Sequence, residues 1–140
     1  MDRQTLIAGL NEDLAAEYSA IIQYIHYSAM VRGPWRSELR AFFQAEIPDE
    51  QLHAQYLSDK IAAMGCTPTT LVTPVREADS AEEMLKAVRD AERDAVNRYT
   101  ERAKQAGELG EIGLKVQLEN FIADEQGHLQ EVEQMLAGWR

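Results

Sequence analysis

Apolar residues recur at every third or fourth position along most of the chain, and no stretch alternates strictly between apolar and polar residues. The first spacing puts apolar side chains on one face of an α-helix, whereas alternation is typical of half-buried β-strands. The pattern therefore predicts an all-α fold. We expect a first helix at about residues 4–32, a second at about 36–64, a third that opens at Ser80 and a fourth that ends near Leu136.

Turn-forming residues separate these helices. Gly33 and Gly65 are expected to end the first two helices, because glycine commonly follows the last helical residue. Ser80, followed three residues later by Glu83, predicts a capping box at the start of the third helix. Residues 66–79 contain two prolines and several threonines, and they predict an ordered connection between the second and third helices.

Pro48 is the one residue that conflicts with the second helix. A proline inside a helix deletes one backbone hydrogen bond and crowds the carbonyl group four residues earlier, which here belongs to Gln44. We therefore expect the helix to kink or to break just before Glu50.

Ionisable residues interrupt each apolar face, and the same set occurs once in each half of the chain. In both halves a glutamate precedes a Glu-x-x-His motif by the same distance. Burying an isolated carboxylate costs on the order of several kcal/mol, so its charge must be compensated. We find no lysine or arginine at matching inward positions. The six residues form three pairs related by one constant shift: Glu17 and Glu92, Glu50 and Glu125, His53 and His128.

Four carboxylates and two imidazoles are a suitable ligand set for two divalent transition-metal ions inside a four-helix bundle. Residues three apart lie on the same side of one helical turn, so each Glu-x-x-His motif aims two ligands at one point. A single motif of this kind is more often a solvated pair, but two on the most apolar faces indicate a metal site. The third histidine, His26, lies about half a turn from the face of Glu17 and predicts a surface or interface residue.

Two tyrosines and two aspartates accompany the six residues with the same constant shift. Tyr24 and Tyr99 each follow a glutamate by seven residues on the same face. They are either core residues or hydroxyl donors to the metal-binding carboxylates. Asp49 and Asp124 precede the glutamates of the two motifs. We infer that one of these aspartates hydrogen-bonds a ligand histidine from the opposite helix.

Composition limits the function classes. The chain of 140 residues fits a single domain, residues 1–140, and 45% hydrophobic residues can supply its core. The net charge of -10 and the lack of a basic patch argue against a nucleic-acid partner. Cys66 is the only cysteine, so an intrachain disulfide and a Cys-x-x-Cys metal site are excluded.

The sequence shows no signal peptide and no membrane span. The segment from Met1 to Ala16 carries Asp2, Glu12 and Asp13 among its apolar residues, which interrupts any signal-peptide core. No uninterrupted apolar run long enough to span a membrane occurs elsewhere in the chain. We therefore expect a cytoplasmic protein without a membrane partner.

The six residues and their spacing resemble the ferritin-like di-iron carboxylate proteins, and the pattern is closest to that of the bacterioferritins. The resemblance spans nearly the whole chain. It implies a ferritin-like four-helix bundle with a long crossover between the second and third helices, and two iron ions as cofactors, with manganese and zinc as alternative metals. It further implies that Glu50 and Glu125 bridge the two irons, with Glu17 and His53 completing one iron and Glu92 and His128 the other.

Two positions depart from the patterns of related proteins. Bacterioferritins carry a haem-ligating methionine directly after the bridging glutamate of the second helix, where this chain has Gln51, so we expect no haem. Rubrerythrins carry an additional glutamate three residues beyond the ligand of the third helix, where this chain has Ala95. This difference makes a rubrerythrin-type peroxidase the weaker interpretation.

The leading interpretation is a ferroxidase that oxidises Fe(II) with dioxygen at the di-iron centre, for iron storage or detoxification. The alternative is a di-iron or dimanganese peroxidase or oxygenase, rubrerythrin-like or quinone-hydroxylase-like, acting on peroxide or an organic substrate. A third interpretation is a metal-binding protein without turnover. We expect a homodimer or a larger homo-oligomer. An antiparallel dimer surface on the first two helices would include Tyr27, Met30, Val31 and Trp35.

Overall fold

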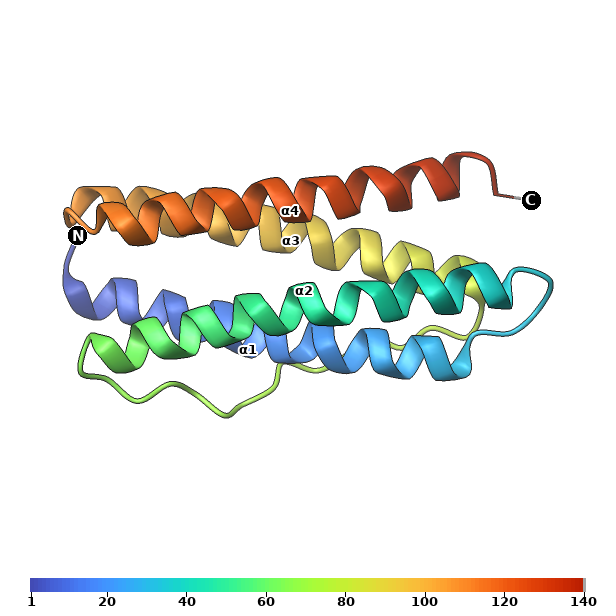
Figure 1. Ribbon diagram of the computed structural model, residues 1–140, viewed down its shortest axis with the longest axis horizontal. Helices are drawn as coiled ribbons and strands as arrows, with labels where there is room; N and C mark the ends of the chain where they lie inside the picture. The colour runs from blue at the N-terminus through green and yellow to red at the C-terminus, as the bar shows by residue number, and fades with distance from the viewer. Residues whose placement is uncertain (140) are drawn as a thin grey trace.

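Four long helices make up the fold of the chain. The computed structural model describes residues 1–139 and contains no strand within them. Consecutive helices α1 and α2 form one antiparallel hairpin, and α3 and α4 form a second (Figure 1). Because α2 and α3 run in the same direction, a connection along the length of the bundle joins them. The helices are α1 (Arg3–Met30), α2 (Arg36–Ala63), α3 (Ala81–Glu108) and α4 (Ile112–Ala137).

Side chains at the helix starts explain where two helices begin. Asp2 accepts a hydrogen bond from the backbone N–H of Thr5 at 2.8 Å, and α1 starts directly after it. Ser80 accepts a hydrogen bond from the N–H of Glu83 at 3.1 Å, which confirms the predicted start of α3. The carboxylate of Glu83 accepts the N–H of Asp79 rather than that of Ser80.

The predicted break at Pro48 is wrong, because α2 continues through this residue. Pro48 and Gln44 are both exposed, so the carbonyl group that loses its helical hydrogen bond faces water. Water can replace the lost donor at little cost, so the helix continues to Glu50 without a break. The turn expected after this helix is present, with α2 ending at Ala63 and Gly65 following at a φ of 82°.

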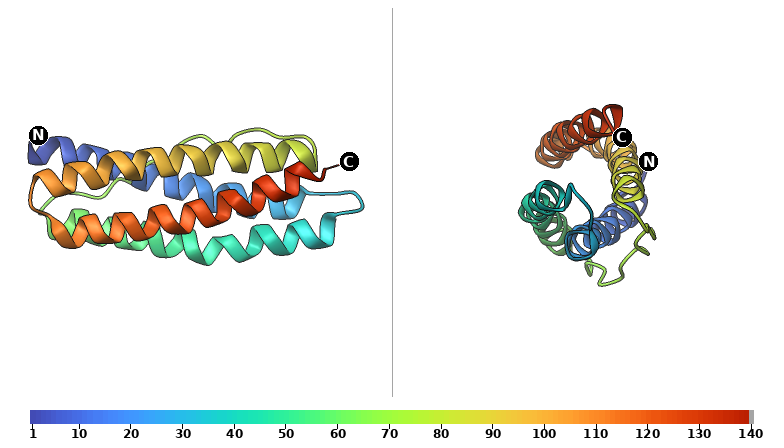
Figure 2. Two further views of the ribbon diagram at one scale, coloured as in Figure 1. Left: turned by 90° about the horizontal axis from the view of Figure 1, so that it is seen from above. Right: turned by 90° about the vertical axis from the view of Figure 1, so that its right-hand side faces the viewer.

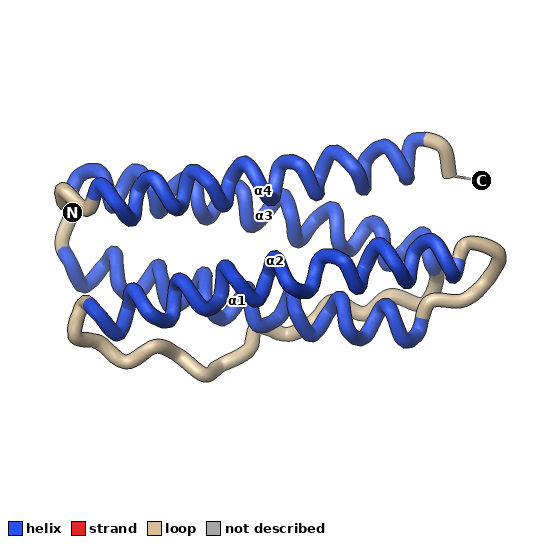
Figure 3. Tube along the Cα trace, in the orientation of Figure 1, coloured by secondary structure: helices blue, strands red, loops and turns tan. Residues whose placement is uncertain are grey.

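The connection between α2 and α3 follows the outer side of α1, as the tube in Figure 3 shows. The N–H of Thr69 donates to the side chain of Asn11 at 2.8 Å, and the N–H of Thr73 donates to the carbonyl of Ala15 at 3.2 Å. The hydroxyl of Tyr27 donates to the carbonyl of Arg76 at 2.5 Å. These bonds confirm the predicted ordered connection. The predicted four-helix bundle with a long crossover is confirmed as well.

Two apolar clusters fill the two halves of the bundle and leave a polar layer between them. One cluster, which includes Leu10, Leu57 and Leu118, lies toward the start of α1. The other, which includes Tyr27, Phe43 and Val88, lies toward the end of α1. The right-hand view in Figure 2, which looks along the bundle, shows the four helices arranged around one axis. Nonpolar packing therefore holds the helices on both sides of the ionisable residues.

The surface expected for a dimer needs correction. Tyr27 and Val31 are buried, with 0% and 1% of their surface exposed, because both face the second apolar cluster. Met30 and Trp35 are exposed at 57% and 50%. His26 is exposed, as predicted. Among the described helices, none is long and apolar enough to span a membrane.

Candidate metal centre

The six residues of the repeat meet near the middle of the bundle. Two overlapping groups form, and within each group one ligand atom per residue lies within 4.8 Å of all the others. Glu50 and Glu125 belong to both groups. The first group adds Glu17 and His53 to these two, and the second adds Glu92 and His128.

Each of the four helices contributes to the centre, and the helical spacing explains how. Glu17 comes from α1 and Glu92 from α3, while α2 and α4 each supply a glutamate and the histidine three residues later. The four glutamates are only 1–3% exposed. These carboxylates are therefore held away from water, where a negative charge requires a compensating partner.

Tyrosine hydroxyls bind two of the carboxylates across the bundle. The hydroxyl of Tyr24, on α1, donates to Oε1 of Glu92, on α3, at 2.5 Å. The hydroxyl of Tyr99, on α3, donates to Oε1 of Glu17, on α1. Both tyrosines are also fully enclosed in the core. They therefore pack in the core and hold the carboxylates, the two roles that the sequence left open.

Aspartates from the opposite helix bind both histidines. Nε2 of His53 lies 3.0 Å from Oδ2 of Asp124, and Nε2 of His128 lies 3.3 Å from Oδ2 of Asp49. The other ring nitrogen of each histidine faces the glutamates. Nδ1 of His53 lies 3.2 Å from Oε1 of Glu125. An aspartate that accepts the Nε2 proton leaves the Nδ1 lone pair available to a metal.

One atom of each of the six residues is buried without a hydrogen-bond partner among residues 1–139. A buried polar atom without a partner typically costs about 1–3 kcal/mol, so six in one place need an explanation. Each of the six is a lone-pair donor, and together they suit two divalent ions. The atoms are Oε2 of Glu17, Oε1 of Glu50, Nδ1 of His53, Oε2 of Glu92, Oε1 of Glu125 and Nδ1 of His128.

Without metal, protons bound to the glutamates and histidines compensate the negative charge of the centre. Burial, together with the nearby charges of Glu17 and Glu125, raises the pKa of Glu50 well above its usual value. Burial also raises the pKa of Glu125. Although burial alone would lower the pKa of His53, its contacts with Glu125 and Glu17 raise it to about 10. Burial opposes ionisation of Glu17, but its contacts with Glu50 and His53 lower its pKa.

Glu46 is a residue of the site that the repeat did not reveal. Its Oε2 lies 2.7 Å from Nε2 of His128, and it forms a further possible ligand group with Asp49 and His128. The matching position in the second half of the chain holds Phe121, whose ring stacks on His53 with centroids 4.1 Å apart. The two halves of the centre are therefore unequal. The spacing of Glu46, one helical turn before Glu50, was the available signal.

One arginine points inward, away from the positions that match the glutamates. Arg102 is 6% exposed, and its guanidinium binds Asp13 through Nε at 2.8 Å and Nη2 at 3.2 Å. Arg102 lies on the same face of α3 as Tyr99, one turn further along, which explains its inward direction. Because Asp13 neutralises it, Arg102 does not supply the charge that the glutamates need.

Comparisons with known proteins agree with this architecture. The family model of the ferritin-like domain (Ferritin) matches residues 7–140. Bacterioferritin of Streptomyces coelicolor is 30% identical over 132 residues, which cover 94% of this chain and 79% of that protein. Bacterioferritin BfrA of Mycobacterium tuberculosis is 31% identical over 128 residues, which cover 91% of this chain and 80% of that protein.

Solved structures show the same fold. The crystal structure of ferritin-like, diiron-carboxylate proteins from Bacillus anthracis matches with a TM-score of 0.94 and 47% identity, covering 97% of this chain and 99% of that chain. The bacterioferritin BfrA structure from Mycobacterium tuberculosis matches with a TM-score of 0.87 and 29% identity, covering 98% of this chain and 86% of that chain. These likenesses confirm the resemblance predicted from the six residues.

Proposed function

Because this chain belongs to the ferritin-like family, we propose that its buried glutamates and histidines bind two Fe(II) ions and oxidise them with dioxygen. The observation that carries the proposal is the set of six buried lone-pair atoms without a hydrogen-bond partner among the described residues. Glu50 and Glu125, which belong to both ligand groups, would bridge the two ions. Fe(II) is the substrate here, with manganese and zinc as competing ions.

The reaction needs two electrons for each dioxygen, and each Fe(II) gives one. Two protons are taken up, so that two Fe(II), one dioxygen and two protons yield two Fe(III) and one hydrogen peroxide. Anionic carboxylates favour the higher charge of Fe(III), and four of them balance two divalent ions before the reaction. Tyr24 and Tyr99 hold Glu92 and Glu17 in place through their hydroxyls.

The site also favours a small oxidant over a large organic substrate. A cavity of about 170 Å³ adjoins the centre, and glutamates and arginines form much of its wall. Sites for drug-sized organic ligands are usually about 300–1,000 Å³ and mostly apolar. Hydrogen peroxide fits this small polar space, which lacks the apolar walls typical of sites for large organic substrates. A peroxide-dependent oxidation at the same centre is therefore the second candidate. Storage of the ferric product in a homo-oligomeric shell would follow from either reaction.

The test compares Fe(II) oxidation in the wild type and in variants of the centre. Glu50→Ala and His128→Ala should abolish rapid aerobic oxidation, measured as dioxygen consumption at about two Fe(II) per dioxygen. Glu131→Ala, an exposed glutamate on α4, serves as the matched control and should keep the wild-type rate. Unchanged oxidation in both centre variants would refute the proposal. Replacing dioxygen by peroxide under anaerobic conditions identifies the preferred oxidant.

A further inference from the structure

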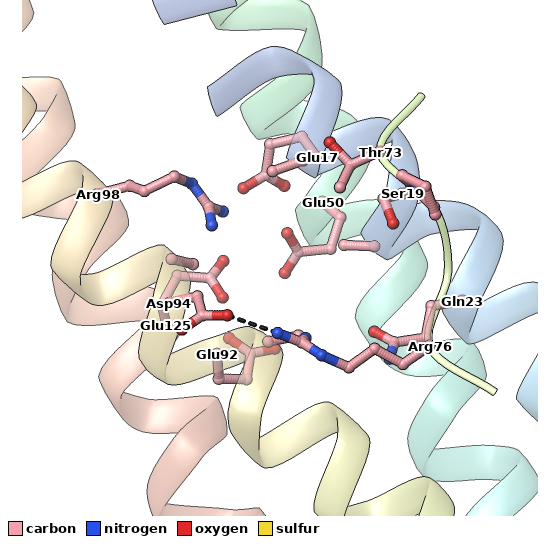
Figure 4. A pocket seen from close by; sticks show the side chains of 15 residues that line it. Glu17, Ser19, Gln23, Glu50, Thr73, Arg76, Glu92, Asp94, Arg98 and Glu125 are labelled. Carbon is pink, nitrogen blue, oxygen red and sulfur yellow. Dashed lines mark hydrogen bonds and ion pairs between the residues drawn. The ribbon is translucent and has the colours of Figure 1, made fainter. Parts of the chain in front are cut away.

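The cavity beside the metal centre lies between α1, α3 and the crossover segment. Glu17, Glu50 and Glu92 form part of its inner wall. Arg76 and Arg98 lie at its sides, and Figure 4 shows both guanidinium groups directed into the same space as the glutamates. The cavity therefore brings cationic side chains next to the anionic ligands of the centre.

Arg98 has hydrogen-bonding capacity that the described residues do not use. Its side chain is 24% exposed, and its Nε is buried without a hydrogen-bond partner among residues 1–139. Oδ1 of Asp13 lies 3.5 Å from this Nε, but Asp13 already accepts two hydrogen bonds from Arg102. One carboxylate thus faces two guanidinium groups, and one positive charge is left beside the cavity.

The other charges around the cavity cancel once metal is bound. Nη2 of Arg76 pairs with Oδ2 of Asp94 at 2.5 Å, so these two residues are neutral together. Two divalent ions balance the four glutamates of the centre. The charge of Arg98 then dominates the cavity, and each divalent ion offers an anion an open coordination position that a protonated carboxylate lacks.

From this arrangement we propose that the cavity binds a small oxyanion, held by Arg98, when the centre carries its two metal ions. A guanidinium group matches carboxylate and phosphate oxygens with two parallel hydrogen bonds. The volume of about 170 Å³ equals the liquid volume of roughly five to six water molecules, at about 30 Å³ each. Formate, acetate and inorganic phosphate fit this volume.

The inference rests on the proposed metal centre, and it assigns Arg98 as the anion-binding residue. The anion would lie beside the ions, on the side of the centre that faces α1 and α3. Metal binding and anion binding should therefore strengthen each other, since the divalent ions attract the anion and the coupling between two sites is reciprocal.

The experiment uses the full chain loaded with Co(II), which gives a visible spectrum without consuming dioxygen as a substrate. Formate and inorganic phosphate are titrated separately into the Co(II)-loaded and the metal-free protein, and binding is followed by the Co(II) spectrum and by calorimetry. We expect saturable binding to the loaded wild type and none to the metal-free form. The preferred anion shows whether a carboxylate or a phosphate is recognised.

Variants separate this inference from the proposed function. Arg98→Gln should weaken anion binding by about tenfold or more while Co(II) binding remains at about two ions per chain. Arg98→Lys keeps the charge without the planar fork and should fall between Arg98→Gln and the wild type. Arg93→Gln, an exposed arginine on the same helix that pairs with Glu133, is the matched control and should bind like the wild type.

Three outcomes would overturn different conclusions. If the wild type binds fewer than about two Co(II) per chain, the proposed metal centre fails. If two Co(II) bind, but the anion is absent or binds equally to the wild type and Arg98→Gln, the anion site fails and the metal centre stands. If Arg98→Gln does not fold, equal anion binding by Arg98→Lys and the wild type, together with loss in Arg76→Gln, would assign the anion to Arg76 and overturn the role of Arg98.

Discussion

At the scale of single residues, the two ring nitrogens of each histidine have different partners. Nε2 of His53 faces Asp124 and its Nδ1 faces the glutamates. Nε2 of His128 faces both Glu46 and Asp49, and its Nδ1 faces Glu50. The aspartate fixes the ring orientation and the position of the proton. The metal affinity of each site should therefore depend on an aspartate that does not contact the metal.

Replacing Asp124 tests this dependence. Asp124→Ala should lower the affinity for the metal about 10–100-fold, because His53 loses the acceptor that orients it. A competition titration with a coloured chelator measures the affinity. Asp59→Ala is the matched control, since Asp59 is an exposed aspartate of α2 that accepts a hydrogen bond from Gln55. An equal affinity in the two variants would show that Asp124 does not orient the ligand.

The sequence predicted these residues wherever the two halves of the chain carry the same residue type. The constant shift between the halves identified both tyrosines and both aspartates together with the six residues that meet in the middle of the bundle. Glu46 escaped because the second half has Phe121 at the matching position, so nothing repeats there. Arg98 and Asp13 were not predicted for another reason. Their contact joins two different helices, and the spacing of residues within one helix does not show which helices are neighbours.

At the scale of the helices, a glycine of α1 makes room for the buried ion pair. A Cβ atom at Gly9 would lie 2.1 Å from Nη1 of Arg102, well inside contact distance. The guanidinium cannot move away without losing its two hydrogen bonds to Asp13. Close approach of α1 and α3 at this level therefore depends on the missing side chain.

Two glycine substitutions with opposite expected effects test this packing. Gly9→Ala should destabilise the fold by about 1–3 kcal/mol, because steric overlap outweighs the better helix propensity of alanine. Gly127→Ala, in α4, should stabilise it by about 0.5–1 kcal/mol, since an added Cβ meets nothing within 4 Å. Chemical denaturation gives both values. Stabilisation by both substitutions would mean that Arg102 has room to move.

Helix boundaries were the easier part of the prediction. All four helices were predicted, and the predicted ends lie within a few residues of those observed, because apolar spacing and capping residues are local signals. The expected break at Pro48 failed because the effect of a proline depends on whether the freed carbonyl meets water. The exposure of that side of α2 follows from tertiary packing.

At the scale of the whole molecule, a buried ionisable layer separates two apolar clusters. In the metal-free protein this layer retains protons that the unfolded chain would release at the same pH. His53 is the clearest case, since contact with Glu125 and Glu17 outweighs burial and raises its pKa from 6.5 to about 10. A group that binds its proton more tightly in the folded state loses its stabilising effect as the pH rises through that pKa.

The melting temperature of the metal-free protein should therefore fall between about pH 6.5 and pH 10. The raised pKa values of Glu50 and Glu125 act in the same direction, and the lowered pKa of Glu17 acts at pH values below 4.5, outside this window. With two divalent ions bound, the same residues are held deprotonated, so the fall should disappear and the melting temperature should rise. Calorimetric scans with chelator and with Zn(II) measure both effects. If the melting temperature of the metal-free protein instead rose across this pH range, His53, Glu50 and Glu125 would not hold the protons assigned to them here.

The crossover is the covalent link between the two helical hairpins, and it contributes none of the six ligands. Each possible ligand group contains three residues of one hairpin and one glutamate of the other. The single glutamate is Glu125 in the first group and Glu50 in the second. A protease that cut the crossover would leave two polypeptides, and neither would contain all four residues of either ligand group. The bound ions would then link the two pieces. Without the ions, the apolar contacts and the side-chain hydrogen bonds between the hairpins, such as those of Arg102 with Asp13, would have to hold the pieces together.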